Sequence, residues 1–354
     1  MFSSAINLVR SGCKTAYPCA AVAVGVGDSV FVREFFGNRQ EKPELLPITA
    51  DTLFDLASLS KLVATTTVAL KLIEKGYISH EDSIGKFLDY TGNYGDCRIF
   101  HLLTHTSGMP AGLPLFRMEH KNGDVLRTVL DSEKCCNTGE KVIYSCMGYI
   151  VLQRILETAG GKALDKLAEE YVFSPLGMKN ACYNPMTKAS ELRALPIAAT
   201  ELYSHTGQWA TGHVHDENAY FLGGVSGNAG VFATLDDMIC FARMCSSGKD
   251  AKGNIYLSRE TLELALKNHT STKGEARGFG FQLKGDGNFP AGTLLSEGSF
   301  GHTGFTGTSF YTDRKTGLWG ILLTNAVHWG RENREEYFSV RKRFYDMIVS
   351  EYNG

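Results

Sequence analysis

FDLASLSKLVATTT, at residues 54–67, places a lysine three residues after a serine where a helix is predicted to begin. Downstream of Ser58, apolar residues recur with helical spacing as far as Gly76, a typical stop signal. The pattern predicts that Ser58 lies at or inside the first turn, with Lys61 on the same helix face. Because the positive end of a helix favours developing negative charge, Ser58 is a candidate nucleophile with Lys61 as its partner.

The spacing of serine and lysine is not specific by itself. It occurs five times, starting at Ser11, Ser58, Ser83, Ser246 and Ser339. Ser246 lies in the loop-like SSGKD and Ser339 lies among the charges of a predicted C-terminal helix. For Ser58, the alternative interpretation is a capping serine beside a solvated lysine, so further motifs have to decide.

Length and charge limit the possible partners. A chain of 354 residues is long enough for one large domain or two lobes. Its 36 basic and 38 acidic residues are intermixed, with a net charge of -2, and form neither a basic stripe for nucleic acid nor a polybasic membrane patch. We therefore expect a small-molecule substrate as partner, no nucleic acid and no membrane, with the oligomeric state left open.

Cysteine usage and the N-terminal residues bear on the compartment. The first residues contain no apolar stretch of signal-peptide length, and no segment approaches the eighteen or more apolar residues of a membrane span. The nine cysteines are an odd set without metal-type spacing, which predicts reduced thiols. We expect a cytoplasmic protein, although a precursor whose signal has been removed would give the same pattern.

Strand patterns stand near both termini. CAAVAVGVG at 19–27 and SVFVREFFG at 29–37 are β-rich runs joined around Gly27 and Asp28, which predicts a hairpin. Three strand-like runs return later, before an amphipathic helix predicted at 332–351. These runs are FGFQL at 279–283, GTSFYTD at 307–313 and GLWGILLTN at 317–325.

The intervening region has helical patterns, such as YIVLQRILETAGG and ALDKLAEEYVF, separated by turns. The predicted fold class is therefore α/β of the α+β type, with an antiparallel sheet flanked by helices and an inserted, mainly helical lobe. The sheet lobe is expected to comprise residues 1–76 and 215–354, and the helical lobe residues 77–214. Together they form one domain, with the site in the cleft between the lobes.

Further motifs follow FDLASLSK in a fixed order: HLLTHTSG, the YSC element at 144–146, SPLGM, HDENAYFLGGVSGNAGVFAT and the HTG strand at 302–304. With these motifs the chain resembles the serine β-lactamase and penicillin-binding-protein superfamily over nearly its whole length. The closest resemblance is to its class C β-lactamase-like, D,D-peptidase and carboxylesterase branch. A β-lactamase/transpeptidase-like fold is what this resemblance implies.

The resemblance also implies roles for residues. Ser58 would be the acylated nucleophile, with Lys61 and Tyr144 as its catalytic partners. Lysine serves as a base only if its pKa falls, whereas Tyr144 could exist partly as phenolate, so the choice of base stays open. The oxyanion hole would be made by the backbone N–H groups of Ser58 and Phe305. The substrate-binding residues would be Cys146, His302, Thr303 and Gly304.

Two residues depart from the pattern of the superfamily. HTG replaces the KTG of many β-lactamases and peptidases, so the permanent cation gives way to His302, which with an ordinary pKa near 6.5 is expected to be mostly neutral at pH 7 and to weaken recognition of a substrate carboxylate. This argues against a dedicated β-lactamase. Cys146 stands where Asn, Asp or Ser is usual, and because a thiol is a weak hydrogen-bonding group, Lys61 is expected to be poorly anchored.

Other histidines receive structural interpretations. A second HTG at 205–207 lies in a polar stretch and is interpreted as a loop, and His101 and His105 as core or supporting residues. The HVHDE run at 213–217 could suggest a metal site, but it lacks a complementary distant pair of ligands. We therefore expect no metal and no cofactor.

The resulting hypothesis is a cytoplasmic serine hydrolase that uses a Ser58 acyl-enzyme on small esters or D-amino-acid amides. One alternative is a D,D-carboxypeptidase or weak β-lactamase. Another is a catalytically silent relative that binds a ligand or assembles through the same cleft, an alternative that the unusual Cys146 makes more plausible.

Overall fold

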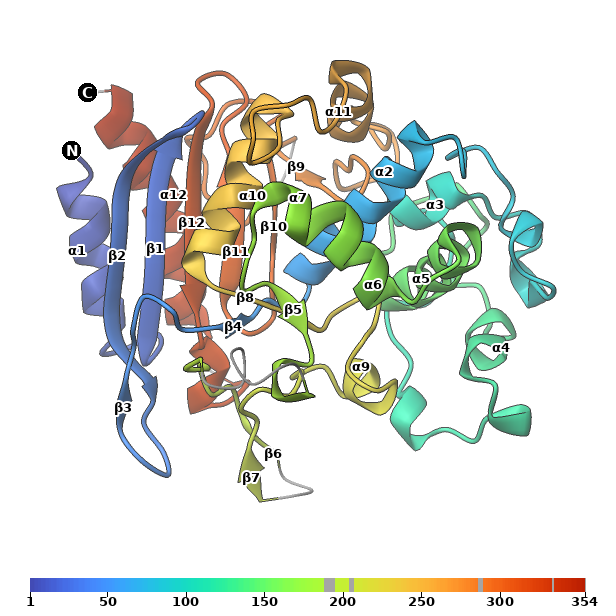
Figure 1. Ribbon diagram of the computed structural model, residues 1–354, viewed down its shortest axis with the longest axis horizontal. Coiled ribbons are helices and arrows are strands. Elements are labelled where there is room, and N and C mark those ends of the chain that lie inside the picture. The colour runs from blue at the N-terminus through green and yellow to red at the C-terminus, as the bar shows by residue number, and fades with distance from the viewer. Residues whose placement is uncertain (188–194, 204–206, 286–288, 333, 354) are drawn as a thin grey trace.

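The computed structural model describes residues 1–187, 195–203, 207–285, 289–332 and 334–353. Within these residues, seven strands form an antiparallel sheet in the order β3-β2-β1-β12-β11-β10-β9 (Figure 1). The strands are β1 (Cys19–Val26), β2 (Ser29–Gln40), β3 (Leu46–Pro47), β9 (Gln282–Leu283), β10 (Phe300–Thr303), β11 (Thr308–Thr312) and β12 (Leu318–Thr324). The predicted N-terminal hairpin is confirmed, and its first strand pairs with β12.

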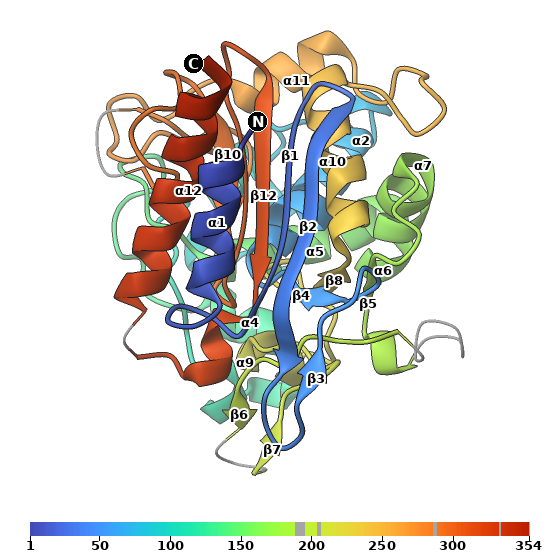
Figure 2. The same cartoon turned by 90° about the vertical axis from the view of Figure 1, so that its left-hand side faces the viewer.

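Helices cover both faces of this sheet. α1 (Ser3–Gly12) and α12 (Glu335–Asn353) lie side by side on one face, in front of the strands in Figure 2. α10 (Leu235–Ser247) packs against β1 and β12 on the other face. The sheet is therefore the middle layer of three.

β1 is buried on both faces, which explains its continuous apolar sequence. Successive side chains of a strand point to opposite sides. Val22 and Val24 accordingly join the core beneath α1 and α12, whereas Ala21 and Ala23 join the core on the side of α10. A strand buried on both faces needs no polar residue at alternate positions.

Most of the remaining helices lie on the side of the sheet away from α1 and α12, as Figure 1 shows. They are α2 (Thr67–Glu74), α3 (Ile99–Leu103), α4 (Val125–Leu130), α5 (Cys146–Gly160), α6 (Leu164–Ala168), α7 (Ser174–Leu176), α9 (Glu217–Phe221) and α11 (Arg259–Leu266). α5 and α6 confirm the two helical patterns in the sequence. α6 continues as a π-helix over Glu169–Phe173.

A small second sheet fixes the segment before the candidate nucleophile. β8 (Val231–Ala233) lies between β4 (Phe54–Asp55) and β5 (Cys182–Tyr183). β5, together with β6 (Leu202–Tyr203) and β7 (Gln208–Trp209), falls in the region that the sequence predicted as mainly helical. Strands of two residues have no periodicity, so the sequence pattern could not reveal them.

The predicted fold class is confirmed, because an antiparallel sheet is combined with helices that cover both of its faces. The division into lobes at 76/77 and 214/215 stays a prediction. No helix in the described ranges is both long enough and apolar enough to cross a membrane.

Candidate active site

Ser58 lies in a turn between β4 and the helix that follows. The buried carboxylate of Asp55 holds this turn, since it accepts hydrogen bonds from the backbone N–H groups of Ala57 (2.8 Å) and His215 (2.6 Å). Burial raises the pKa of Asp55, and the two hydrogen bonds oppose that shift. Ala57 has a φ of 46°, which alanine rarely adopts, so these contacts stabilise a strained backbone directly before Ser58.

The helix after Ser58 ends where the sequence predicted but winds unexpectedly at its start. Lys61–Thr66 form a π-helix, η1, which continues as α2. The helix stops before Gly76, whose φ is 73°. Short π-helical segments are rare and frequently accompany functional sites.

Lys61 is fully buried, and its ammonium group has three acceptors. Nζ lies 3.2 Å from Ser58 Oγ, 3.4 Å from Cys146 Sγ and 2.8 Å from the carbonyl oxygen of Asn228. Burial alone would lower the pKa of Lys61, but its interactions with Cys146 and Tyr144 outweigh burial and raise it. Lys61 is therefore a cation that donates to Ser58, and the lowered pKa that a lysine base needs is not found.

Cys146 faces Lys61, as the sequence predicted. It opens α5, which Ser145 caps by accepting a hydrogen bond from the backbone N–H of Gly148 (3.1 Å). The expectation that Cys146 leaves Lys61 poorly anchored is wrong, because the carbonyl of Asn228 supplies a strong acceptor at 2.8 Å.

Tyr144 lies beside Lys61 among other rings. Its ring centroid is 5.0 Å from Lys61 Nζ, 4.6 Å from the ring centroid of His105 and 5.7 Å from that of His302. Its hydroxyl oxygen is buried and forms no hydrogen bond with another described residue. Burial, and then the charges of Arg277 and Lys61, lower the pKa of both histidines, so Tyr144 faces neutral imidazoles and two cations.

The HTG motif reaches the site at the end of β10. β9 pairs only with Phe300 and Gly301, so His302 and Thr303 have no strand partner on that side. β10 is not the outermost strand of the sheet, but the part that carries His302 forms an edge. Thr303 is partly exposed there, whereas His302 is buried.

The turn after β10 is tied to the segment that precedes the candidate nucleophile. Thr306 Oγ1 donates to the carbonyl oxygen of Asp55 (2.7 Å), and Thr308 Oγ1 donates to that of Leu56 (3.0 Å). Gly304 packs against the same Leu56 carbonyl, where a Cβ would lie only 2.3 Å from the oxygen. A larger residue than glycine would therefore push the two segments apart.

The two backbone amides expected to form the oxyanion hole are free. Neither the N–H of Ser58 nor that of Phe305 donates a hydrogen bond to another residue in the described ranges. The Phe305 ring is 47% exposed and stacks on His215, with a centroid distance of 5.6 Å. Donors that the fold does not use remain available to a developing oxyanion.

His302 is neutral over a wider pH range than a histidine of ordinary pKa would be. Its side chain is buried, and burial followed by the charges of Arg277 and Lys61 lowers its pKa to about 3. Nδ1 lies 2.7 Å from the carbonyl oxygen of Thr303, which can only accept, so Nδ1 carries the proton. An anionic substrate group therefore meets no positive charge at His302.

We expect this buried imidazole to make stability depend on pH. Because the folded-state pKa of His302 lies below the ordinary 6.5, its stabilising effect is present above pH 6.5 and is lost as the pH falls towards 3. Between pH 7 and pH 5, wild type should lose about 2 kcal/mol more unfolding free energy than His302→Gln, measured by denaturant titration. Equal losses in the two proteins would contradict a neutral His302.

The other candidate cluster, at 213–217, is engaged in structural contacts. His215 Nε2 lies 2.7 Å from Glu201 Oε2, and Asp216 caps α9. In the part of the chain that the structure describes, no group of three or more His, Cys, Asp or Glu side chains could hold a metal ion. The first two residues of the HTG at 205–207 lie outside the described residues.

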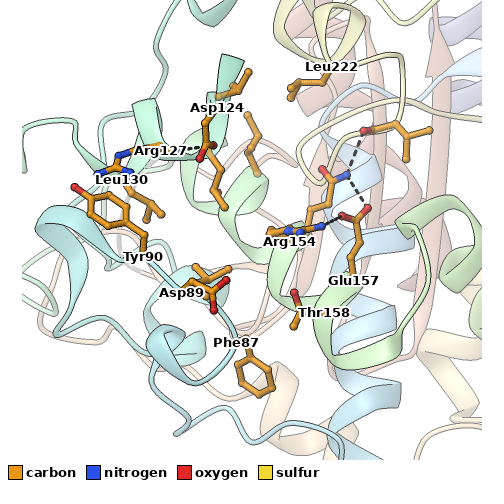
Figure 3. Close-up of a pocket in the computed structure, with 16 residues that line it drawn as sticks. Phe87, Asp89, Tyr90, Asp124, Arg127, Leu130, Arg154, Glu157, Thr158 and Leu222 are labelled. Atoms are coloured by element: carbon orange, nitrogen blue, oxygen red, sulfur yellow. Dashed lines mark hydrogen bonds and ion pairs between the residues drawn. The ribbon is translucent and has the colours of Figure 1, made fainter. Parts of the chain in front are cut away.

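A separate cavity of about 570 Å³ lies between α4, α5 and neighbouring loops (Figure 3). Its walls carry both signs of charge, with Arg127 and Arg154 near Asp124 and Glu157. None of the candidate catalytic residues lines this cavity. It is therefore not the place where Ser58 would meet a substrate.

Two contributors to the site escaped the sequence analysis. Asn228 acts through its backbone carbonyl, which any residue could provide. Arg277 places its guanidinium carbon 5.3 Å from the ring centroid of Tyr144, but it stands in no motif. Only the tertiary structure brings either residue to Lys61 and Tyr144.

Fold and site together place the chain among the serine hydrolases of the β-lactamase superfamily. Residues 6–343 match the Beta-lactamase family, and the chain belongs to that family. An Escherichia coli O157:H7 protein named "Putative D-alanyl-D-alanine carboxypeptidase" is 31% identical over 312 residues, covering 79% of this chain and 70% of the relative. The predicted superfamily is thereby confirmed.

Solved structures show the same fold at lower sequence identity. EstCE1, described as "a hydrolase with promiscuous acyltransferase activity", superposes with a TM-score of 0.74 at 20% identity, covering 96% of this chain and 97% of EstCE1. Unliganded simvastatin synthase (LovD) from Aspergillus terreus gives a TM-score of 0.73 at 20% identity, covering 99% and 98% of the two chains.

Proposed function

We propose that Ser58 forms an acyl-enzyme with small carboxylic esters and with D-amino-acid amides. The observation that carries this proposal is the placement of its hydroxyl, which is partly exposed and lies 3.2 Å from the buried ammonium of Lys61. A capping serine would accept a hydrogen bond from a helix N–H. Ser58 Oγ accepts none from any described backbone N–H, which favours a nucleophile over a cap.

In the proposed reaction, Ser58 Oγ attacks the carbonyl carbon while its proton passes to the phenolate oxygen of Tyr144. Lys61 remains protonated and stabilises negative charge on Oγ. The new oxyanion accepts hydrogen bonds from the N–H groups of Ser58 and Phe305, worth roughly 3 kcal/mol per donor. Tyr144 then returns the proton to the leaving alcohol or amine, and water hydrolyses the acyl-enzyme by the same route.

The substrate class follows from the charge of the site and from one relative. A neutral His302 offers no permanent cation for the carboxylate of a β-lactam, which favours uncharged esters. The name of the E. coli relative supports D-alanyl amides as a second substrate. D,D-carboxypeptidase or weak β-lactamase activity is therefore the runner-up.

A fluorophosphonate probe, which phosphonylates serine nucleophiles, tests the proposal directly. Mass spectrometry of the digested protein should find the adduct on the peptide that contains Ser58, with parallel loss of p-nitrophenyl acetate hydrolysis. An unlabelled Ser58 in a protein that hydrolyses the ester would contradict the assignment.

Cys146 should set the preference between amides and esters. Cys146→Asn gives Lys61 and a substrate amide a stronger hydrogen-bonding group, and esters with good leaving groups depend less on it. We expect the ratio of kcat/KM for a D-alanyl amide to that for p-nitrophenyl acetate to rise roughly tenfold, equivalent to one hydrogen bond of about 1.4 kcal/mol in the transition state. An unchanged ratio would mean that Cys146 does not contact the reacting substrate.

We also propose a cytoplasmic location, with small molecules as partners and neither nucleic acid nor membrane among them. Free thiols such as those of Cys19, Cys97 and Cys245 support this location. The intermixed charge, with a net value of -2, supports the absence of polyanionic partners. Recovery of the full chain in a membrane or secreted fraction would contradict the location.

A further inference from the structure

Arg277 is a buried cation for which the proposed reaction has no role yet. Its side chain is 4% exposed. Nη2 and Nε pair with Glu275 Oε2 at 2.6 and 3.2 Å, but Nη1 forms no hydrogen bond with another described residue. Burying an unsatisfied donor of a charged group is costly, so this arginine calls for a role beyond packing.

Arg277 and Lys61 act on the same ring. Cζ of Arg277 lies 5.3 Å from the ring centroid of Tyr144, and Nζ of Lys61 lies 5.0 Å from it. The Tyr144 hydroxyl oxygen is buried and has no hydrogen-bond partner among the described residues. Two cations attract the face of a neutral phenol only weakly, but they stabilise a phenolate by direct Coulomb attraction.

The HTG strand carries no positive charge where a KTG strand carries its lysine. The lysine of KTG would be a permanent cation at the position of His302, which is buried and neutral here. Arg277 comes from the segment before β9, where its backbone N–H donates to Thr270 Oγ1 (2.8 Å). A different part of the chain thus brings a buried guanidinium, paired with Glu275, to the ring of Tyr144.

We propose that Arg277 is a positioning residue that supplies the positive charge missing from the HTG strand and, with Lys61, stabilises negative charge on the Tyr144 oxygen. Tyr144 can then accept the proton of Ser58. This inference rests on the proposed function of Ser58 and Tyr144. It deepens that function by naming the group that keeps Tyr144 competent as a base.

Few of the groups around Tyr144 could produce the acid limb of a pH profile in its place. His105 and His302 are neutral, and burial raises the pKa of Tyr149 to about 12. Lys61 stays charged, and Glu275 pairs with Arg277. The thiol of Cys146 is the remaining group, so each measurement is repeated in a Cys146→Ala background. The titratable and charged groups facing Tyr144 are Lys61, His105, Cys146, Tyr149, Arg277 and His302.

The test is the pH dependence of kcat/KM for p-nitrophenyl acetate in three variants. Arg277→Gln should raise the apparent pKa of the acid limb by about one unit and reduce kcat/KM at pH 7 about tenfold. Activity should recover towards wild type at higher pH. Arg277→Lys keeps the charge and should leave the limb nearly in place. Glu275→Gln removes the neutralising partner of Arg277 and should move the limb in the opposite direction, to lower pH.

If Arg277 has only a structural role, Arg277→Gln should lose the same fraction of kcat/KM at every pH, and the apparent pKa of the acid limb should not change. That result overturns the inference. If Arg277→Gln does not fold, Glu275→Gln decides, because a limb that stays in place or moves upwards also overturns it. The ultraviolet difference spectrum of tyrosinate, with Tyr144→Phe subtracted, should shift in parallel with the limb.

Labelling of Ser58 by the fluorophosphonate probe separates the two proposals. If wild-type Ser58 is not labelled, the proposed function itself fails. If Ser58 is labelled in wild type and variants but the acid limb does not respond to Arg277 and Glu275, only the role of Arg277 fails.

Discussion

Replacing Ser58 with alanine is expected to abolish hydrolysis of p-nitrophenyl acetate while the fold remains intact. Ser58 is partly exposed, and among the described residues its hydroxyl accepts a hydrogen bond only from Lys61, so its loss should cost at most about 2 kcal/mol of stability. The proposed reaction loses its nucleophile altogether. Steady-state kinetics together with thermal unfolding checks both halves of this expectation.

Ser83 provides a matched control, because Lys86 follows it at the same spacing. Ser83 is an exposed cap that accepts a hydrogen bond from the N–H of Gly85 (3.2 Å). Ser83→Ala should therefore cost about 1 kcal/mol of stability or less and leave turnover unchanged. Turnover that survives Ser58→Ala would move the nucleophile to another residue.

Removal of Lys61 or of the Tyr144 hydroxyl should each slow acylation by a factor on the order of 10² to 10⁴. The double variant, Lys61→Ala with Tyr144→Phe, should lose much less than the product of the two factors. The reason is that one proton path needs both groups, and residues that act as a unit are not additive. Pre-steady-state measurement of acylation in the four proteins gives the comparison.

Tyr149→Phe is the control for this cycle. Its ring centroid is also close to Lys61, at 5.8 Å, but its hydroxyl pairs with Thr66 Oγ1 (3.1 Å). Loss of that hydrogen bond should lower stability by about 1 kcal/mol and leave acylation nearly unchanged. Fully multiplicative losses for Lys61 and Tyr144 would contradict a shared proton path.

The features that the sequence predicted correctly are those with a local signature. Helical spacing with a stop at Gly76 located the helix after Ser58, and two β-rich runs around Gly27 located the first hairpin. The ordered motifs gave the superfamily. Lys61 meets both Ser58 and Cys146, as their positions in those motifs implied.

What the sequence could not provide depends on burial and on contacts between distant segments. The neutral state of His302 follows from its burial beside two cations, which no motif encodes. The anchoring of Lys61 uses a backbone carbonyl of Asn228, which is independent of side-chain identity. Arg277 lies two residues before FGFQL, a run whose pattern predicted only a strand.

β1 and β12 are neighbours in the sheet although most of the chain separates them, with Ala20 opposite Thr324 and Val26 opposite Leu318. During synthesis the apolar β1 emerges long before its partner β12. Its hairpin with β2 meanwhile exposes an unpaired edge, which is a site for aggregation. A chain interrupted before β12 would thus lack a central strand of the sheet rather than an edge strand. Such a chain would expose an incomplete core to chaperones.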